Sequence, residues 1–324
     1  MSSRVLYLGA LFALAACSDE LSPGSRIEDP RVLGARVEVV GLETSATPAA
    51  GETANVRFFV ATPPTQDGTA AWAFVPCVKQ SGSTPLCAGP LLIDQLAMGE
   101  GEPSMTVRVP AEGDLFGKTS MLLSGIVCFG GTPTFEASGN DLPGCSEGTS
   151  KSQVVTFDFD IAQDGVRNTN PSMQNVVFTL DEGAWEPSLE TAPATDCESS
   201  AGTSSLPRIV AGSTEHELRM NVATVARDTY TRTIPGEPPI VEETREQLLF
   251  SHFASGGSMQ RQFSVLERGE DPPADGFLIK WDALDEAETT GNRVDFYFVV
   301  RDGRGGSDWV MRSACVVGTG VTQD

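Results

Sequence analysis

The sequence has little positive charge and almost no histidine. It contains 22 Lys and Arg against 44 Asp and Glu, which gives a formal net charge of -22. Such an acidic chain repels nucleic acid and anionic lipid headgroups, so we expect neither to be a partner. With 2 His and no CxxC pair, the sequence also lacks the usual ligand sets for zinc. We therefore expect no metal and no cofactor, and we interpret the dispersed acidic residues as a solubilising surface.

The sequence also lacks an apolar run long enough to span a bilayer, which takes about 20 residues. Its clearest uncharged run extends only from Val5 to Ala16, directly after Met1 and Arg4 at the positively charged start of the chain. A short apolar core behind a positive start is typical of a secretory signal peptide. The sequence therefore predicts export from the cytoplasm.

The end of this run carries a second signal. The residues Leu14-Ala15-Ala16-Cys17 resemble the lipobox of bacterial lipoproteins. The resemblance implies that residues 1–16 are removed and that Cys17 becomes the acylated first residue, anchored in a membrane by several acyl chains. Ser18 after the cysteine resembles the sorting signal for the outer membrane of Gram-negative bacteria. Residues 17–30 are polar and are expected to form a lipidated, flexible tether.

Six cysteines remain once Cys17 is assigned to lipid. They are Cys77, Cys87, Cys128, Cys145, Cys197 and Cys315. An even number in an exported chain predicts disulfide bonds. Sequence separation favours Cys77–Cys87, Cys128–Cys145 and Cys197–Cys315. The alternative joins Cys77 to Cys128 and Cys87 to Cys145.

The rest of the chain predicts an all-β fold. Hydrophobic residues make up 40%, and 33 Gly and 21 Pro are typical of a chain with many turns. Short β-branched or aromatic runs recur: 37–40, 56–60, 71–77, 105–109, 121–128, 155–161, 176–180, 218–225, 247–253, 262–266, 277–281, 294–300 and 308–316. Because turn signals separate them, we expect two β-sandwich domains, at 31–164 and 165–324, divided by the polar stretch 163–171. Residues 235–246 are expected to form an exposed loop.

Two segments carry a resemblance to a known fold. The hairpin from Phe296 to Trp309 and the stretch from Arg31 to Thr53 resemble the last and first strands of immunoglobulin-like and PKD-like domains of bacterial surface proteins. The resemblance implies two such domains in tandem. Among the tryptophans, we expect Trp72, Trp281 and Trp309 in the cores, and Trp185 at an exposed or interdomain position.

Signals for catalysis are weak. The segment Gly113 to Thr119 has the wrong spacing for a phosphate loop and is interpreted as a hairpin loop. His216 and His252 are the only imidazoles, and the chain has no GxSxG or HExxH motif. A Ser/His/acid triad assembled in space stays open, but we interpret both histidines as ordinary strand or loop residues.

Two carboxylate pairs were considered as sites. Asp158 and Asp160 lie on one face of a predicted strand, which is more typical of a solvated face than of an acid/base pair. Asp302 and Asp308 flank a Gly-rich turn, where a calcium site would resemble those of some extracellular β-sandwiches, although EF-hand spacing is absent.

These observations predict a non-enzymatic lipoprotein of the cell envelope, held on the outer membrane by its lipid anchor. It would act as a binding, adhesion or structural spacer module toward another envelope protein or a polysaccharide. The alternative is a hydrolase of cell-wall or extracellular polymer, which a cleft with convergent carboxylates or a Ser–His contact would favour. A third hypothesis, ligand binding for uptake, requires a hinge and a deep pocket between the domains.

Overall fold

The computed structural model describes residues 24–64, 69–134, 144–146, 151–186, 197, 206–234, 236, 238–287 and 291–318. The described chain is all-β, as predicted, and includes the short 3-10 turns η1 (Ile93–Gln95) and η2 (Glu112–Asp114). No helix in these ranges has the length and apolarity needed to cross a membrane. The predicted signal peptide and Cys17 lie outside the described residues.

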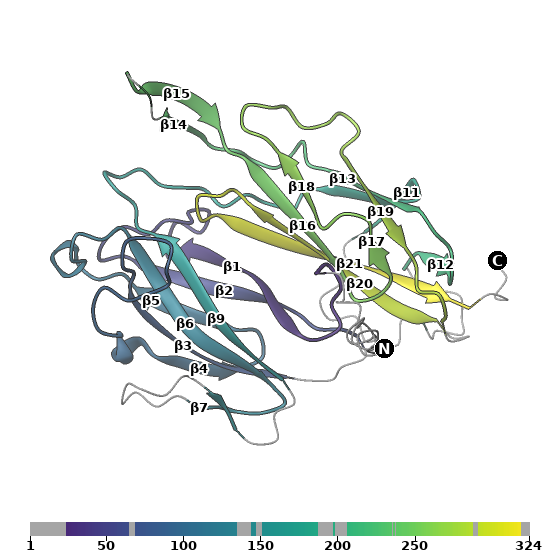
Figure 1. Ribbon diagram of the computed structural model, residues 1–324, viewed down its shortest axis with the longest axis horizontal. Helices are drawn as coiled ribbons and strands as arrows, with labels where there is room; N and C mark the ends of the chain where they lie inside the picture. The colour runs from purple at the N-terminus through teal and green to yellow at the C-terminus, as the bar shows by residue number, and fades with distance from the viewer. Residues whose placement is uncertain are drawn as a thin grey trace, which may run out of the picture.

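Most strands of residues 31–160 form two facing sheets, the first sheet pair (Figure 1). One sheet contains, in spatial order, β1 (Arg31–Val39), β2 (Thr53–Ala61) and β5 (Ser104–Arg108). The other contains β4 (Ala97–Glu100), β3 (Ala70–Val78), β6 (Ser120–Phe129) and β9 (Lys151–Asp160). Between them lies an apolar core in which Phe58 stacks on Phe74 with ring centroids 4.3 Å apart.

The later strands form the second sheet pair. Its first sheet contains β11 (Gly183–Ala184), β10 (Val177–Leu180), β13 (His216–Asn221), β19 (Phe277–Asp282) and β17 (Ser258–Met259). Its second sheet contains β12 (Arg208–Val210), β21 (Ser307–Val317), β20 (Asn292–Arg301), β16 (Leu248–Ala254) and β18 (Phe263–Leu266). A separate core fills this pair, with Trp281 packed edge-on against Phe296.

Two short hairpins complete the fold: β7 (Pro133–Thr134) with β8 (Gly144–Cys145), and β14 (Thr229–Ile234) with β15 (Ile240–Arg245). The second hairpin corrects a prediction. Half of the Pro- and Glu-rich segment expected as a loop, residues 240–245, pairs with β14 over the full length of β15. The β-branched residues Ile240, Val241 and Thr244 favour a strand despite the neighbouring acidic residues.

The two sheet pairs pack against each other through a third apolar layer, which we call the seam. It contains Ile27, Leu33, Ala61, Tyr297 and Val299 as fully buried residues. At its edge Phe59 stacks on Trp309, with ring centroids 5.1 Å apart. In Figure 1, β1 and β2 lie between the sheet of β6 and β9 and the strands β20 and β21. Both faces of the β1–β2 ribbon are therefore covered.

The stretch that joins the sheet pairs holds two buried asparagines, unlike a free linker. Asn168 and Asn170 are 2% and 5% exposed. Asn170 donates through Nδ2 to the Val37 carbonyl at 2.7 Å. Arg167 forms a two-pronged ion pair with Glu52, with N–O distances of 2.8 and 2.7 Å. This pairing lowers the pKa of Glu52, chiefly through the hydrogen bond from Arg167. The predicted boundary region thus fixes the halves in place.

The expected tether is also shorter than predicted. Ile27 is 0% exposed in the seam, and its N–H donates to the Ala254 carbonyl at 2.8 Å. The Ala254 N–H in turn donates to the Ser25 carbonyl at 2.9 Å. Residues 25–27 therefore belong to the folded body rather than to a free linker.

The tryptophans separate into core and seam. Trp72 and Trp281 are buried in the cores, as predicted. Trp185 corrects a prediction, because it is 3% exposed and its Nε1 donates to the Ser313 carbonyl at 2.9 Å. Trp309 was expected in a core but lies at the seam instead. The loop around Trp185 turns inward because Phe296 offers an edge-on contact at 4.9 Å.

Candidate functional site

The structure pairs all six described cysteines. The disulfides are Cys77–Cys87, Cys128–Cys145 and Cys197–Cys315. This is the pairing that sequence separation favoured, and the alternative between Cys77 and Cys128 is not formed. The first two bonds close short loops, whereas the third joins residues 118 positions apart.

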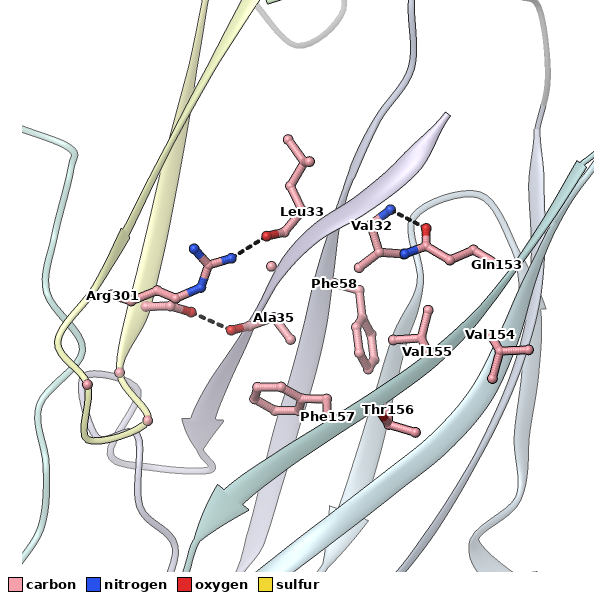
Figure 2. Close-up of a pocket in the computed structure, with 15 residues that line it drawn as sticks. Val32, Leu33, Ala35, Phe58, Gln153, Val154, Val155, Thr156, Phe157 and Arg301 are labelled. Atoms are coloured by element: carbon pink, nitrogen blue, oxygen red, sulfur yellow. Dashed lines mark hydrogen bonds between the residues drawn. The ribbon is translucent and has the colours of Figure 1, made fainter. Parts of the chain in front are cut away.

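A cavity of about 430 Å³ opens between β1 and β9, which are edge strands of the two facing sheets in the first sheet pair. We call it the edge cavity. Figure 2 shows the rings of Phe58 and Phe157 projecting into the space between these strands. The two rings meet edge to face at 6.0 Å between centroids. The turn between β20 and β21 closes one side with Arg301, Gly303, Gly305, Gly306 and Ser307. Both sheet pairs therefore build the cavity.

The β1 edge of this cavity is capped by side chains from beyond the first sheet pair. Arg301 donates to the Leu33 carbonyl, and Ser307 Oγ donates to the Ala35 carbonyl (Figure 2). Asn170 donates to the Val37 carbonyl, the next acceptor along the same edge. A bare edge strand presents unpaired backbone groups, and these three donors occupy the β1 acceptors.

The β9 edge is uncapped. Ile161 N–H donates to the Thr119 carbonyl, so the odd-numbered residues of β9 direct their backbone groups toward β6. The alternation of a strand then directs the backbone N–H and C=O groups of Ser152, Val154 and Thr156 away from β6. None of these groups has a hydrogen-bond partner among the described residues. Val154 is 58% exposed, and Figure 2 shows its side chain pointing away from the cavity.

Rigid contacts hold the wall formed by the β20–β21 turn. The Asp302 carboxylate accepts from the backbone N–H groups of Arg304 and Gly306, at 2.7 and 2.9 Å, and from Asn168 Nδ2 at 2.7 Å. Burial raises the pKa of Asp302, although these donors oppose the shift. Burial also lowers the pKa of Arg301, whose guanidinium has no carboxylate partner in the described chain. The wall is therefore preorganised and carries one partly desolvated cation.

The structure brings Ser213, His216 and Asp181 together in the second sheet pair. Ser213 Oγ lies 2.6 Å from His216 Nε2, and His216 Nδ1 lies 2.7 Å from Asp181 Oδ2. Sequence reasoning left such a triad open but marked neither Ser213 nor Asp181. The Ser213–His216 spacing of three residues at a turn was the available signal.

Hydrogen counting limits what this triad can do. Ser213 Oγ also donates to the Val210 carbonyl, which uses its single hydrogen. While that hydrogen is held by the Val210 carbonyl, it is not directed at His216 Nε2, as a serine activated by a histidine base requires. None of the three residues lines the edge cavity.

The same group stabilises two strained turns. Asp181, Glu182 and Glu215 adopt left-handed backbone conformations, with φ of 48°, 68° and 62°. Residues other than glycine rarely adopt this backbone conformation, so the turns need support from their surroundings. Asp181 Oδ1 supplies it by accepting from the Glu217 N–H at 2.9 Å, alongside its bond to His216.

The remaining candidates are occupied or buried. His252 is 0% exposed in the second core, and burial lowers its pKa to about 4. Asp158 pairs with Lys79 at 2.6 Å, and Asp160 accepts from Ser120 at 2.8 Å. Both carboxylates therefore serve the outer face of β9.

The considered calcium site does not assemble. Asp302 caps its own turn, whereas Asp308 forms an ion pair with Arg36 at 2.9 Å and accepts from the Met173 N–H at 2.6 Å. Across the described ranges, no group of three or more His, Cys, Asp and Glu side chains is arranged to hold a metal ion. The segment Gly113 to Thr119 lies between β5 and β6, with η2 at its start.

The comparisons with known proteins give no relative. No protein-family profile matches the chain, and no curated protein matches it in sequence.

Proposed function

We propose that this chain is a non-enzymatic lipoprotein of the outer membrane, in which two immunoglobulin-like β-sandwiches form one rigid module that binds another envelope macromolecule. The edge cavity carries the proposal. Its lining includes two aromatic rings and no carboxylate, imidazole or thiol. A cavity of this volume with an apolar floor and few polar groups is typical of binding sites.

The seam supports rigidity over hinge motion. Apolar burial, the Phe59–Trp309 stack and the buried asparagines fix one sheet pair on the other. A hinge for ligand uptake needs an interface that opens without exposing such a layer. The geometry therefore favours a display module over an uptake protein.

The anchor is tested by fractionation. In a Gram-negative host the Cys17→Ala variant should leave the membrane fraction for the soluble fraction, because it has lost its acyl attachment site. The parent chain is the control. A variant that stays in the membrane fraction like the parent would overturn the lipid-anchor proposal.

Binding is tested by site-specific photo-crosslinking in the native envelope. A photoreactive residue at Val154, whose exposed side chain points outward from the β9 edge of the cavity, should capture a discrete partner that covers this edge. Val177 on β10 is the control, since it is similarly exposed, at 60% against 58%, but lies on the other sheet pair. Protease and glycosidase digestion then assigns the adduct to protein or polysaccharide. Equal capture at both positions, or no capture, contradicts the proposal.

The Ser213–His216–Asp181 contact gives a hydrolase one specific observation in its favour. A fluorophosphonate probe tests it, because only an activated serine forms the covalent adduct. From the hydrogen count we expect no labelling, with Ser213→Ala as the matched control. Labelling of the parent chain that disappears in Ser213→Ala would establish the second candidate and displace the binding module.

A further inference from the structure

The two strands that border the edge cavity differ in whether their outward backbone groups have hydrogen-bond partners. Three donors, from Arg301, Ser307 and Asn170, occupy successive carbonyls of β1. On the opposite side the outward backbone groups of β9 meet no donor or acceptor in the described residues. Edge strands are normally blunted by charge, proline or a covering segment, because a bare edge recruits other chains.

The uncapped part of β9 is also a strong strand former without charge. Its sequence from Ser152 to Phe157 is Ser-Gln-Val-Val-Thr-Phe, and the charged residues of β9 occur only outside it, at Lys151, Asp158 and Asp160. Lys151 pairs with Asp29, and Asp158 pairs with Lys79. The charges that could discourage strand pairing are therefore engaged at the two ends.

From this asymmetry we propose that β9 is a docking edge for one extended polypeptide segment, which adds to the sheet as a further strand. The inference depends on the proposed binding function and assigns its partner class. Alternating backbone donors and acceptors along one line match another peptide backbone and have no counterpart in a polysaccharide. The edge cavity then receives one inward-facing side chain of the added strand.

The cavity determines the composition of that segment. Its floor is formed by Phe58, Val155 and Phe157, so the side chain above it is aliphatic or aromatic. The net charge of -22 on this chain disfavours an acidic segment. The partner segment is thus an extended strand whose side chains alternate between the cavity side and the outer side, and its net charge is neutral or basic. The same charge opposes the pairing of β9 with β9 of a second copy.

The test uses phage-displayed random eight-residue segments selected against the full-length lipidated chain in detergent. The blocking variant is Thr156→Pro, because proline removes an outward N–H at a position where an edge strand tolerates it. Thr156→Val is the matched control, since it keeps that N–H. Selected peptides should alternate apolar and polar residues along the sequence, with an apolar residue for the cavity. They should bind at least tenfold more weakly to Thr156→Pro than to Thr156→Val.

A second measurement separates backbone from side-chain recognition. A selected peptide is synthesised with its alternate backbone nitrogens methylated, which keeps every side chain and removes the hydrogen-bond donors. Its binding should fall at least tenfold as well. Amide exchange of Val154 and Thr156 should slow when the unmodified peptide is added. Circular dichroism of both Thr156 variants checks that they are folded.

Several outcomes would overturn the inference. They are a library that yields no binder, peptides that bind both Thr156 variants equally, methylation without effect, or a dimer in light scattering that Thr156→Pro dissociates. The last result would assign the edge to a second copy. If Val154 still captures a partner in the envelope while the peptides fail, the binding module stands and the strand-addition inference alone is refuted.

Discussion

Two buried titratable groups of the second half should give this chain a pH dependence in which they oppose each other. His252 is 0% exposed, and burial lowers its pKa from 6.5 to about 4, although an interaction with the Arg261 backbone opposes the shift. Glu246 is 2% exposed, and burial raises its pKa from 4.5 to about 7, although Arg304 pairs with it at 2.7 Å.

The signs follow from which state holds the proton. Between pH 4 and 6.5 the unfolded chain protonates His252 and the folded chain does not, so the free energy of unfolding rises with pH. Between pH 4.5 and 7 the folded chain protonates Glu246 and the unfolded chain does not, so that free energy falls with pH. Each slope is about 1.4 kcal/mol per pH unit. From pH 4.5 to 6.5 the two contributions cancel.

Single substitutions should therefore reveal opposite slopes. Relative to the parent chain, the free energy of unfolding of His252→Leu should fall by about 2 kcal/mol from pH 4.5 to 6.5, because the full slope holds only midway between the two pKa values. That of Glu246→Gln should rise by about the same amount. Urea unfolding followed by tryptophan fluorescence at three pH values and constant salt measures this. Contributions shared by all three chains, such as that of Glu52, cancel in the differences from the parent. Asp302 interacts with the Glu246 charge, so its contribution cancels only for His252→Leu.

The test depends on the slope of the free energy of unfolding against pH. The loss of packing or of the Arg304 ion pair shifts the whole curve of a variant and leaves this slope unchanged. Curves for His252→Leu that run parallel to the parent would show that His252 titrates alike in the folded and unfolded chains. The reasoning from burial would then be refuted for this group. Parallel curves for Glu246→Gln would refute it for the carboxylate.

Two other predictions concern stability. Replacing both Cys197 and Cys315 by Ala should lower the free energy of unfolding by about 4.9 kcal/mol, against about 2.7 kcal/mol for replacing Cys77 and Cys87. The difference arises because the loop-closure entropy grows with the length of the closed loop, which is 118 residues in the first case and 10 in the second. Denaturant titration of both double variants checks this, and equal losses would contradict it. Phe59→Ala should cost about 2–3 kcal/mol in the same assay, because it removes one ring of the seam stack. An unchanged unfolding midpoint would show that the seam contributes little.

Local pattern predicted much of the fold. The alternation from Val155 to Ile161 predicted β9, and the run from Val294 to Val300 predicted β20. The first succeeded because a period of two records which side faces a core, and the second because β-branched and aromatic residues favour strands. The cysteine pairing also followed from separation along the chain.

The seam was missed, although β20 carries its signal. Tyr297 and Val299 occupy the face opposite to Phe296 and Phe298, and an exposed face would be polar there. An apolar residue on both faces indicates a second covering layer. The layer itself joins residues far apart in sequence, so no local pattern identifies the partner strand.

The edge cavity was equally hidden from sequence reasoning. It depends on β9 and the β20–β21 turn meeting across the seam, with Arg301 reaching the Leu33 carbonyl. The asymmetry between its two edges depends on which carbonyls have partners, which is a property of the assembled chain.

The way residues 25–27 join the second sheet pair has a mechanical consequence. Hydrogen bonds link Ile27 to Ala254 and Ala254 to Ser25, ahead of the start of β1 at Arg31. A force pulling on the N-terminal side of the chain therefore reaches β16 before it reaches β1. The load is shared between both halves from the outset, so they would resist tension together instead of unravelling one after the other.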